Sequence, residues 1–193
     1  MIKERLDGNE DIHTLVEKVK KGDREAFMTV TSLYQKKVFL LAFSFFHNNE
    51  DALDIVQETF LRLFQKVNSF RKGQNFQNWL LQVAKNLCID YHRKNYSRSR
   101  EYDREKPIEE MNLAFQNRGD PYLSSDLSDI FSACLKKLAT KQRLIFAMKH
   151  YNQLEYQEIA QILGISLGTV KSLHFKAVQN MRGLVAPYLG RQL

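Results

Sequence analysis

The sequence predicts an all-α protein in which two small helical domains are joined by a flexible linker and the C-terminal domain is a helix-turn-helix. Apolar side chains recur every three to four residues along most of the chain, which is the spacing of one helix face. Glycine and proline contribute only 8 and 3 of the 193 residues, too few for a fold built mainly from turns. Residues 97–125 are polar, hold two of the three prolines and are too many for a loop inside a compact domain. We therefore expect helical domains at residues 1–96 and 126–193, with residues 97–125 as the linker.

The first domain is expected to contain four helices. Apolar periodicity places them at about residues 12–20, 24–46, 50–67 and 76–94. Gly22 and Asp23 interrupt the pattern between the first two, and Asp23 is a suitable N-cap because its carboxylate can accept the free amides of a first turn. Acidic residues open the third helix, where the helix dipole favours negative charge.

The second domain is also expected to contain four helices, and its last two form a helix-turn-helix between Tyr156 and Arg182. Ile159, Ala160 and Leu163 form the inner face of the first of these helices, and the small Ala160 permits a close helix crossing. Gly164 suits the left-handed position that ends a helix. The corner is completed by Ile165, the cap of the second helix is Ser166, and its inward residues are Val170, Ala177 and Met181.

The other side of that second helix carries basic and hydroxyl side chains. A helix of this kind can enter the major groove, where the residues near its N-terminus reach base edges and lysines reach phosphates. The alternative is a helical hairpin that makes no DNA contact. The candidate duplex-binding residues are Ser166, Thr169, Lys171, Ser172, Phe175 and Lys176.

Positive charge is concentrated in two segments of a chain whose formal net charge is +7. Residues 66–100 hold eight basic side chains and one acid, and residues 167–193 hold four basic side chains and no acid. Two basic segments on an otherwise acidic body indicate two surfaces for a polyanion. A solvated basic face without a ligand is the alternative for either segment alone.

The first basic segment also contains aromatic and amide side chains. Aromatic faces stack on unpaired bases, amides can read the edge of a flipped base, and basic groups follow phosphates. This composition predicts a site for single-stranded nucleic acid. The alternative is that Phe70, Phe76 and Trp79 belong to the core, which for Trp79 is at least as reasonable, and a ring can be packed on one edge and exposed on the other.

The remaining composition indicates the compartment. Cys88 and Cys134 lie in different predicted domains without metal-like spacing, so we interpret both as reduced, apolar packing residues. The N-terminus lacks the apolar core of a signal peptide, and the longest apolar stretch, residues 38–46, is about half of what a membrane span needs. We expect a cytoplasmic protein without membrane insertion.

Residues 51–64, which read DALDIVQETFLRLF, resemble the second conserved region of the extracytoplasmic-function (ECF) group of bacterial RNA polymerase sigma factors. The shared pattern is an acid-rich start, then Gln-Glu, then Phe. In that family this helix docks on the coiled-coil clamp helices of the largest polymerase subunit. The resemblance therefore implies polymerase contacts by Asp51, Asp54, Gln57, Glu58 and Leu61, with Arg62 beside them facing DNA.

Residues 69–94, SFRKGQNFQNWLLQVAKNLCIDYHRK, are similar to the minus-10 recognition segment of the same family. By this resemblance, residues 71–76 form a pocket for a flipped-out base, and basic residues follow it. The implied minus-10 contacts are Arg62, Phe70, Arg71, Lys72, Gly73, Gln74, Asn75, Phe76, Trp79, Asn86, Arg93 and Lys94.

Residues 135–182 resemble the fourth region of the family, which reads the minus-35 element and binds the flap of the second-largest polymerase subunit. GTVKS at residues 168–172 and FKA at residues 175–177 match its recognition helix. Leu173 and Val178 depart from the pattern, because many members have arginine at these positions.

Together these likenesses imply a sigma factor that binds core RNA polymerase, reads minus-35 duplex and traps the melted minus-10 strand. The implied partners are core polymerase, promoter DNA and an anti-sigma factor. The resemblance also implies that the two domains pack on each other when polymerase is absent.

Two other classes of protein remain as alternatives. A stand-alone helix-turn-helix regulator would account for the second domain but not for the acidic helix and aromatic segment of the first. A nucleic-acid enzyme is disfavoured because the five histidines show no i, i+4 metal pair and no phosphate-binding glycine loop occurs. Asp51 and Asp54 could hold Mg²⁺, although an acidic helix start explains them as well. We expect no enzymatic activity, no cofactor and no metal.

Overall fold

The computed structural model describes residues 11–46, 48–71, 73–98 and 125–189, which form eight α-helices and one 3-10 turn and contain no strand. The all-α prediction is therefore confirmed, whereas most of the predicted linker lies outside the described residues. The elements are α1 (Ile12–Lys20), α2 (Arg24–Phe46), α3 (Asn49–Lys66), η1 (Val67–Ser69), α4 (Phe76–Arg98), α5 (Ser125–Lys136), α6 (Thr140–His150), α7 (Tyr156–Leu163) and α8 (Leu167–Leu189).

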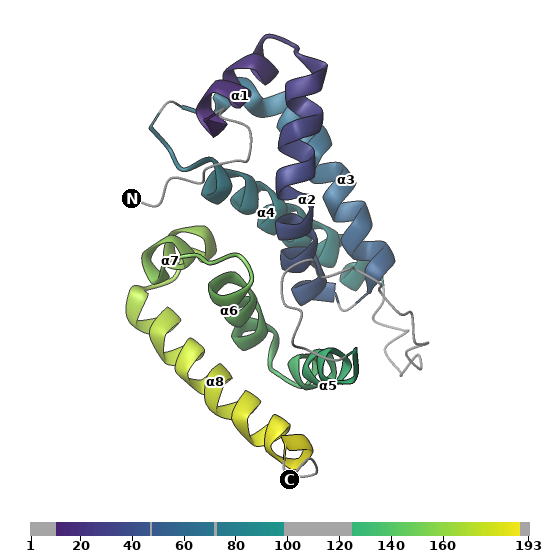
Figure 1. The fold of residues 1–193 in the computed structure, drawn as a ribbon, viewed down its shortest axis with the longest axis vertical. Helices are drawn as coiled ribbons and strands as arrows, with labels where there is room; N and C mark the ends of the chain where they lie inside the picture. Colours follow the sequence, from purple (N-terminus) through teal and green to yellow (C-terminus); the bar gives the residue numbers. More distant parts are fainter. Residues whose placement is uncertain (1–10, 47, 72, 99–124, 190–193) are drawn as a thin grey trace.

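Helix α2 is the central element of the N-terminal half and packs against α1, α3 and α4 (Figure 1). Its start is capped by Asp23, whose Oδ1 accepts the amides of Glu25 and Ala26 at 2.9 and 3.0 Å, so the predicted N-cap is confirmed. Asn48 caps α3 in the same way and accepts the amide of Glu50 at 2.8 Å. Side-chain capping thus fixes where both long helices begin.

The helix-turn-helix has the predicted turn and cap, but in α7 the buried residues are Ile159 and Ile162, whereas Ala160 and Leu163 are half-buried. Gly164 ends α7 with a left-handed φ of 66°, a conformation that side chains with a Cβ rarely adopt. Ser166 caps α8 by accepting the amide of Thr169 at 3.1 Å. Val170, Ala177 and Met181 are buried, as their spacing predicted. One side of α8 is therefore committed to packing, and its opposite side is free.

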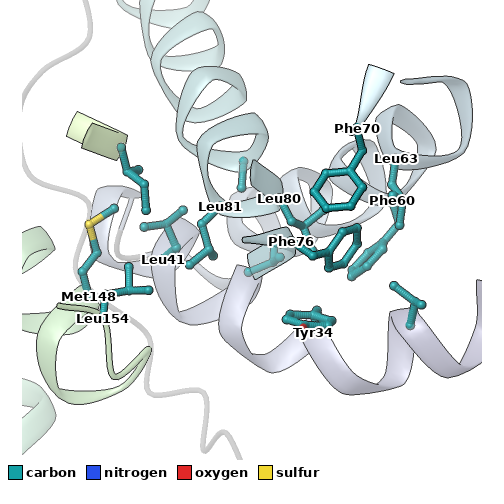
Figure 2. Close-up of a cluster of buried hydrophobic side chains, with 14 of the residues drawn as sticks. Tyr34, Leu41, Phe60, Leu63, Phe70, Phe76, Leu80, Leu81, Met148 and Leu154 are labelled. Carbon is teal, nitrogen blue, oxygen red and sulfur yellow. The ribbon is translucent and has the colours of Figure 1, made fainter. Parts of the chain in front are cut away.

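The two halves of the chain share a hydrophobic core. Leu41 of α2 and Leu81 of α4 lie against Met148 of α6 and Leu154 of the α6–α7 connection, within one cluster that continues to the aromatic residues around Tyr34 (Figure 2). All four interface side chains are at most 1% exposed. The packing of one half on the other, which the family resemblance implied, is thus continuous with the core of the N-terminal half.

Buried hydrogen bonds accompany this apolar contact. Gln77 of α4 donates to the carbonyl of Asn152 at 2.9 Å, and the Asn152 amide donates to the carbonyl of Lys37 at 3.1 Å. The Arg143 guanidinium, which is 6% exposed, donates to the carbonyl of Ser44 at the end of α2 at 2.8 Å. Burial lowers the pKa of Arg143 to about 10. These donors are therefore paired across the interface, whereas Asn152 Oδ1 is buried without a partner.

Both cysteines are buried free thiols, and burial raises the pKa of Cys88 to about 12. This agrees with their interpretation as packing residues. Within the described part of the chain, no helix is long and apolar enough to cross a bilayer, and no group of three or more His, Cys, Asp or Glu residues is placed to hold a metal ion.

Candidate nucleic-acid interface

Five of the six residues predicted to bind duplex lie on the outer side of α8, and the sixth, Ser166, lies at the turn that precedes this helix. All six are exposed, and the aromatic ring of Phe175 is 64% exposed. Lys171 and Lys176 provide positive charge on this side, and Thr169 and Ser172 provide hydroxyl groups near its N-terminal end. A helix with this arrangement can place short polar groups at base edges and lysines at phosphates.

Two histidines connect α8 to α6 and α7. His174 of α8 and His150 of α6 approach with their Nε2 atoms 3.0 Å apart, and the Tyr156 hydroxyl lies 3.0 Å from His174 Nδ1. Burial lowers the pKa of both histidines, and the charge of Lys149 lowers them further; for His174 the neighbouring His150 adds to this effect. The neutral pair thus helps to orient α8 relative to α6 and α7.

The aromatic residues of the first basic segment are mostly core residues. Phe70 and Phe76 are only 3% and 2% exposed, and their rings meet edge to face at 5.4 Å. The expectation that these two rings stack on bases is therefore not met in this structure, because neither presents a free face. Trp79 is half-buried, stacks on Phe76 at 5.9 Å and keeps part of its surface accessible. Figure 2 shows Phe70 and Phe76 within the buried cluster.

Polar residues of the same loop are accessible. Arg71, Gly73, Gln74 and Asn75 are exposed, while Lys72 lies outside the described residues. Gly73 has a φ of 92°, so a side chain there would strain the backbone. The Gln74 side chain accepts the amide of Arg71 at 3.2 Å and closes the turn. The loop therefore offers polar groups to a ligand and keeps its flanking aromatic rings inside.

The accessible residues of α4 continue from this loop as a stripe. Trp79, Asn86 and Arg93 follow one another at intervals of seven residues, which places them on the same side of the helix. Asn86, Arg93 and Lys94 are exposed, and Arg93 lies 4.0 Å from Asp90. The stripe could accommodate an extended strand that leaves the loop along α4.

The predicted polymerase-contacting residues of α3 do not share one environment. Asp54, Gln57 and Leu61 are exposed, but Asp51 is half-buried and accepts the Tyr91 hydroxyl of α4 at 2.5 Å. Glu58 pairs with Arg62 at 2.7 Å along the same helix. Asp51 and Glu58 thus lie at the flank of the exposed face, each with an intramolecular partner.

Two exposed apolar residues of this face were missed at the sequence level. Leu53 is 47% exposed and Phe64 is 60% exposed, and both fall at helical spacing with Asp54, Gln57 and Leu61. The signal was present: the buried positions of α3 define one face, and Leu53 and Phe64 are the apolar residues that do not fit it. We call Leu53, Asp54, Gln57, Leu61 and Phe64 the α3 outer face. Its exposed leucine and phenylalanine side chains give it an apolar character typical of a protein-binding surface.

The chain was compared with protein families, characterised proteins and solved structures. The family models "Sigma-70 region 2" and "Sigma-70, region 4" match residues 31–98 and 128–181. The ECF RNA polymerase sigma factor SigW of Bacillus subtilis is 32% identical over 166 residues, which cover 81% of this chain and 87% of SigW. The ECF RNA polymerase sigma-E factor of Salmonella typhimurium is 32% identical over 184 residues, which cover 92% of this chain and 95% of the relative.

A solved structure is similar as well. The sigma factor RpoE from Bartonella quintana, in complex with the anti-sigma factor NepR, superimposes with a TM-score of 0.69 at 26% identity and covers 83% of this chain and 96% of its own. Two sigma-70 regions in order, on an all-α fold with a helix-turn-helix, define the class of protein. The chain belongs to the ECF group of RNA polymerase sigma factors, which direct promoter-specific initiation of transcription.

Proposed function

We propose that this sigma factor divides promoter recognition between its two halves, with residues 1–96 as region 2, residues 97–125 as the linker and residues 126–193 as region 4. Helix α8 reads the minus-35 element as duplex, and the loop at residues 71–76 with the α4 stripe holds the melted minus-10 strand. The observation that carries the proposal is the exposure of the candidate duplex-binding residues of α8 on a helix whose opposite side is packed. A stand-alone helix-turn-helix regulator is not favoured, because it would account for only the second of the two sigma regions that match.

Run-off transcription with core polymerase and a promoter library tests this proposal directly. The expected result is transcription from a subset of promoters that share two spaced elements. Transcription without sequence preference would contradict the proposal. So would a promoter affinity of this protein that core polymerase does not change.

The α3 outer face is proposed to dock on the clamp helices of the largest polymerase subunit, and the C-terminal half on the flap of the second-largest subunit. Leu61 is 50% exposed, so its replacement by aspartate adds a charge without burying it inside this protein. We expect Leu61→Asp to reduce binding of core polymerase at least tenfold, or about 1.4 kcal/mol, in a pull-down titration. Lys66→Ala, also exposed on α3 but outside this face, is the matched control.

Asn86 is proposed to contact the melted strand. We expect Asn86→Ala to impair promoter opening, followed by permanganate reactivity of unpaired thymines, more than it impairs the initial binding of duplex. Asn68→Ala, another exposed asparagine that lies outside the α4 stripe, serves as the control. Equal loss of opening and of duplex binding would remove Asn86 from the strand site.

An anti-sigma factor is proposed as a further partner. The support is the similarity to Bartonella quintana RpoE, whose structure was determined in complex with the anti-sigma factor NepR. We infer no catalytic role and no cofactor for the chain, and we place its action in the cytoplasm, where the polymerase works.

A further inference from the structure

The side chain of Glu158 connects the helix-turn-helix to the loop proposed for the melted strand. Glu158 lies in the first turn of α7, and its Oε2 accepts the amide of Glu155 at 2.8 Å, which closes the start of that helix. Its Oε1 accepts the side-chain amides of Asn78 at 2.8 Å and Asn75 at 3.2 Å. The carboxylate is thus held in place by its own helix and is directed at the start of α4.

These contacts use the donors of the strand site. Asn75 belongs to the proposed base-binding loop, and Asn78 immediately precedes Trp79, the first residue of the α4 stripe. As a hydrogen-bond acceptor, a carboxylate oxygen that takes two amide hydrogens resembles a phosphate oxygen or a base carbonyl, so it can occupy the same donors. While Glu158 accepts one hydrogen from each amide, those two hydrogens are not available to a strand. Its charge also repels phosphates that approach the loop.

The contact forms part of the larger interface between the halves. Gln77, which lies between Asn75 and Asn78 in the sequence, donates to the Asn152 carbonyl, and Leu81 packs on the other half one turn further along. Separation of the halves would therefore release all these groups together. In contrast, Lys171, Ser172 and Phe175 on the outer side of α8 are exposed in the same closed arrangement.

We propose that Glu158 is a built-in competitor of the melted strand, so that the closed arrangement blocks single-strand capture while it leaves the duplex-reading side of α8 accessible. This inference rests on the proposed function, because it assigns a control to the same strand site. Linkage makes the effect reciprocal: whatever separates the halves raises the affinity for single strand, and bound single strand favours separation.

The test compares Glu158→Gln with Glu155→Gln in the full chain without polymerase. Glutamine can still close the capping box with its carbonyl oxygen, which turns its amide group toward Asn75 and Asn78 and places donors against donors. Glu155 lies at the same helix end and its side chain is 75% exposed, so its replacement removes the same charge without touching the asparagines. The probes are fluorescein-labelled short single strands of mixed sequence, and the same pool as duplex, in anisotropy titrations.

We expect Glu158→Gln to bind the single strands about tenfold more tightly than wild type, as the loss of a competing pair of charge-assisted hydrogen bonds should allow. Glu155→Gln should stay within about twofold of wild type, and duplex affinity should be unchanged in both variants. An equal gain in both variants would show a net-charge effect and overturn the proposal. No gain in Glu158→Gln, or a matching gain for duplex, would also overturn it.

Two further measurements keep the result interpretable. Glu158→Ala removes the acceptor altogether, and we expect a gain in single-strand affinity in the same direction as Glu158→Gln, because Asn75 and Asn78 then lose their intramolecular acceptor. Promoter-directed run-off transcription by the wild-type chain with core polymerase is measured in parallel. Its failure would count against the proposed function, whereas normal transcription with unchanged single-strand binding by Glu158→Gln would count only against the competitor role.

Discussion

The two regions proposed to bind nucleic acid are similar in composition but differ in how they fold. Both combine basic and aromatic residues, yet α8 exposes Phe175 and both lysines, whereas the earlier segment buries Phe70 and Phe76. The difference follows from local geometry. On the packed side of α8, Val170 and Ala177 contact the core, so the outer residues are not needed to bury apolar surface. The loop before α4 instead places the Phe70 and Phe76 rings in the core, where they fill space between the helices. Aromatic residues beside basic residues therefore do not by themselves identify a stacking surface.

Removal of one aromatic ring from each region should have opposite effects on stability and on binding. Phe76→Ala should lower the free energy of unfolding by about 3–5 kcal/mol, because the ring packs against Tyr34, Phe70 and Trp79 and leaves a cavity. Phe175→Ala should change it by no more than about 0.5 kcal/mol, since the ring is exposed, but should weaken duplex binding. Urea denaturation and anisotropy titrations give the two quantities. If Phe76→Ala kept wild-type stability and lost only strand binding, the buried assignment would be wrong.

A smaller but substantial effect is expected at the interface between the halves. Arg143→Met removes donors to the carbonyls of Ser44, Leu138 and Lys136, two of them buried contacts. We expect a loss of about 2 kcal/mol in urea denaturation, because the carbonyls lose their partners while the desolvation cost of the guanidinium is recovered.

Lys141→Met, an exposed lysine of the same helix, is the control and should leave stability unchanged. A stabilised Arg143→Met variant would show that the buried charge costs more than its hydrogen bonds contribute.

Lys171→Ala tests the exposed region alone. Loss of one phosphate contact should weaken minus-35 duplex binding by roughly 1 kcal/mol at low salt and reduce the slope of log affinity against log salt by about one. Lys141→Ala removes an equal charge at a distance from the outer side of α8. The same reduction in slope for both variants would indicate a general charge effect and remove Lys171 from the contact set.

The smallest expected effect concerns the histidine pair behind α8. The pKa of His150 and of His174 is lowered from the ordinary value of 6.5, so the folded protein binds fewer protons there than the unfolded chain. The stabilisation from the neutral pair is thus present above about pH 6.5 and is lost as the pH falls toward and through the lowered values. Thermal melts across this range should show a smaller decrease in Tm for the double variant His150→Gln/His174→Gln than for wild type. An equal decrease would exclude the pair as the source.

The extent of sequence-level prediction differs between the elements. The helix bounds, the Asp23 and Ser166 caps, the Gly164 turn and the inward Val170 all follow from local rules, since each depends on neighbours within about one helical turn. The environment of Asp51 does not follow from local rules, because its hydrogen-bond partner Tyr91 is 40 residues away. Helical spacing does separate Leu53 and Phe64 from the other apolar side of α3, but only the tertiary structure shows which of the two sides meets α2 and α4.

Periodicity and capping were sufficient to predict the helical class, the capped starts and the helix-turn-helix with its exposed outer side, because both act within a single helix. They could not predict which aromatic rings are buried, that Leu41 and Leu81 meet Met148 and Leu154, or that Glu158 reaches Asn75 and Asn78, because these contacts form only in the tertiary structure. These outcomes depend on contacts between residues about 40 to more than 100 positions apart, from Tyr34 and Phe76 to Leu41 and Met148. No local pattern records such contacts, because they arise when two amphipathic halves cover each other's remaining apolar surface.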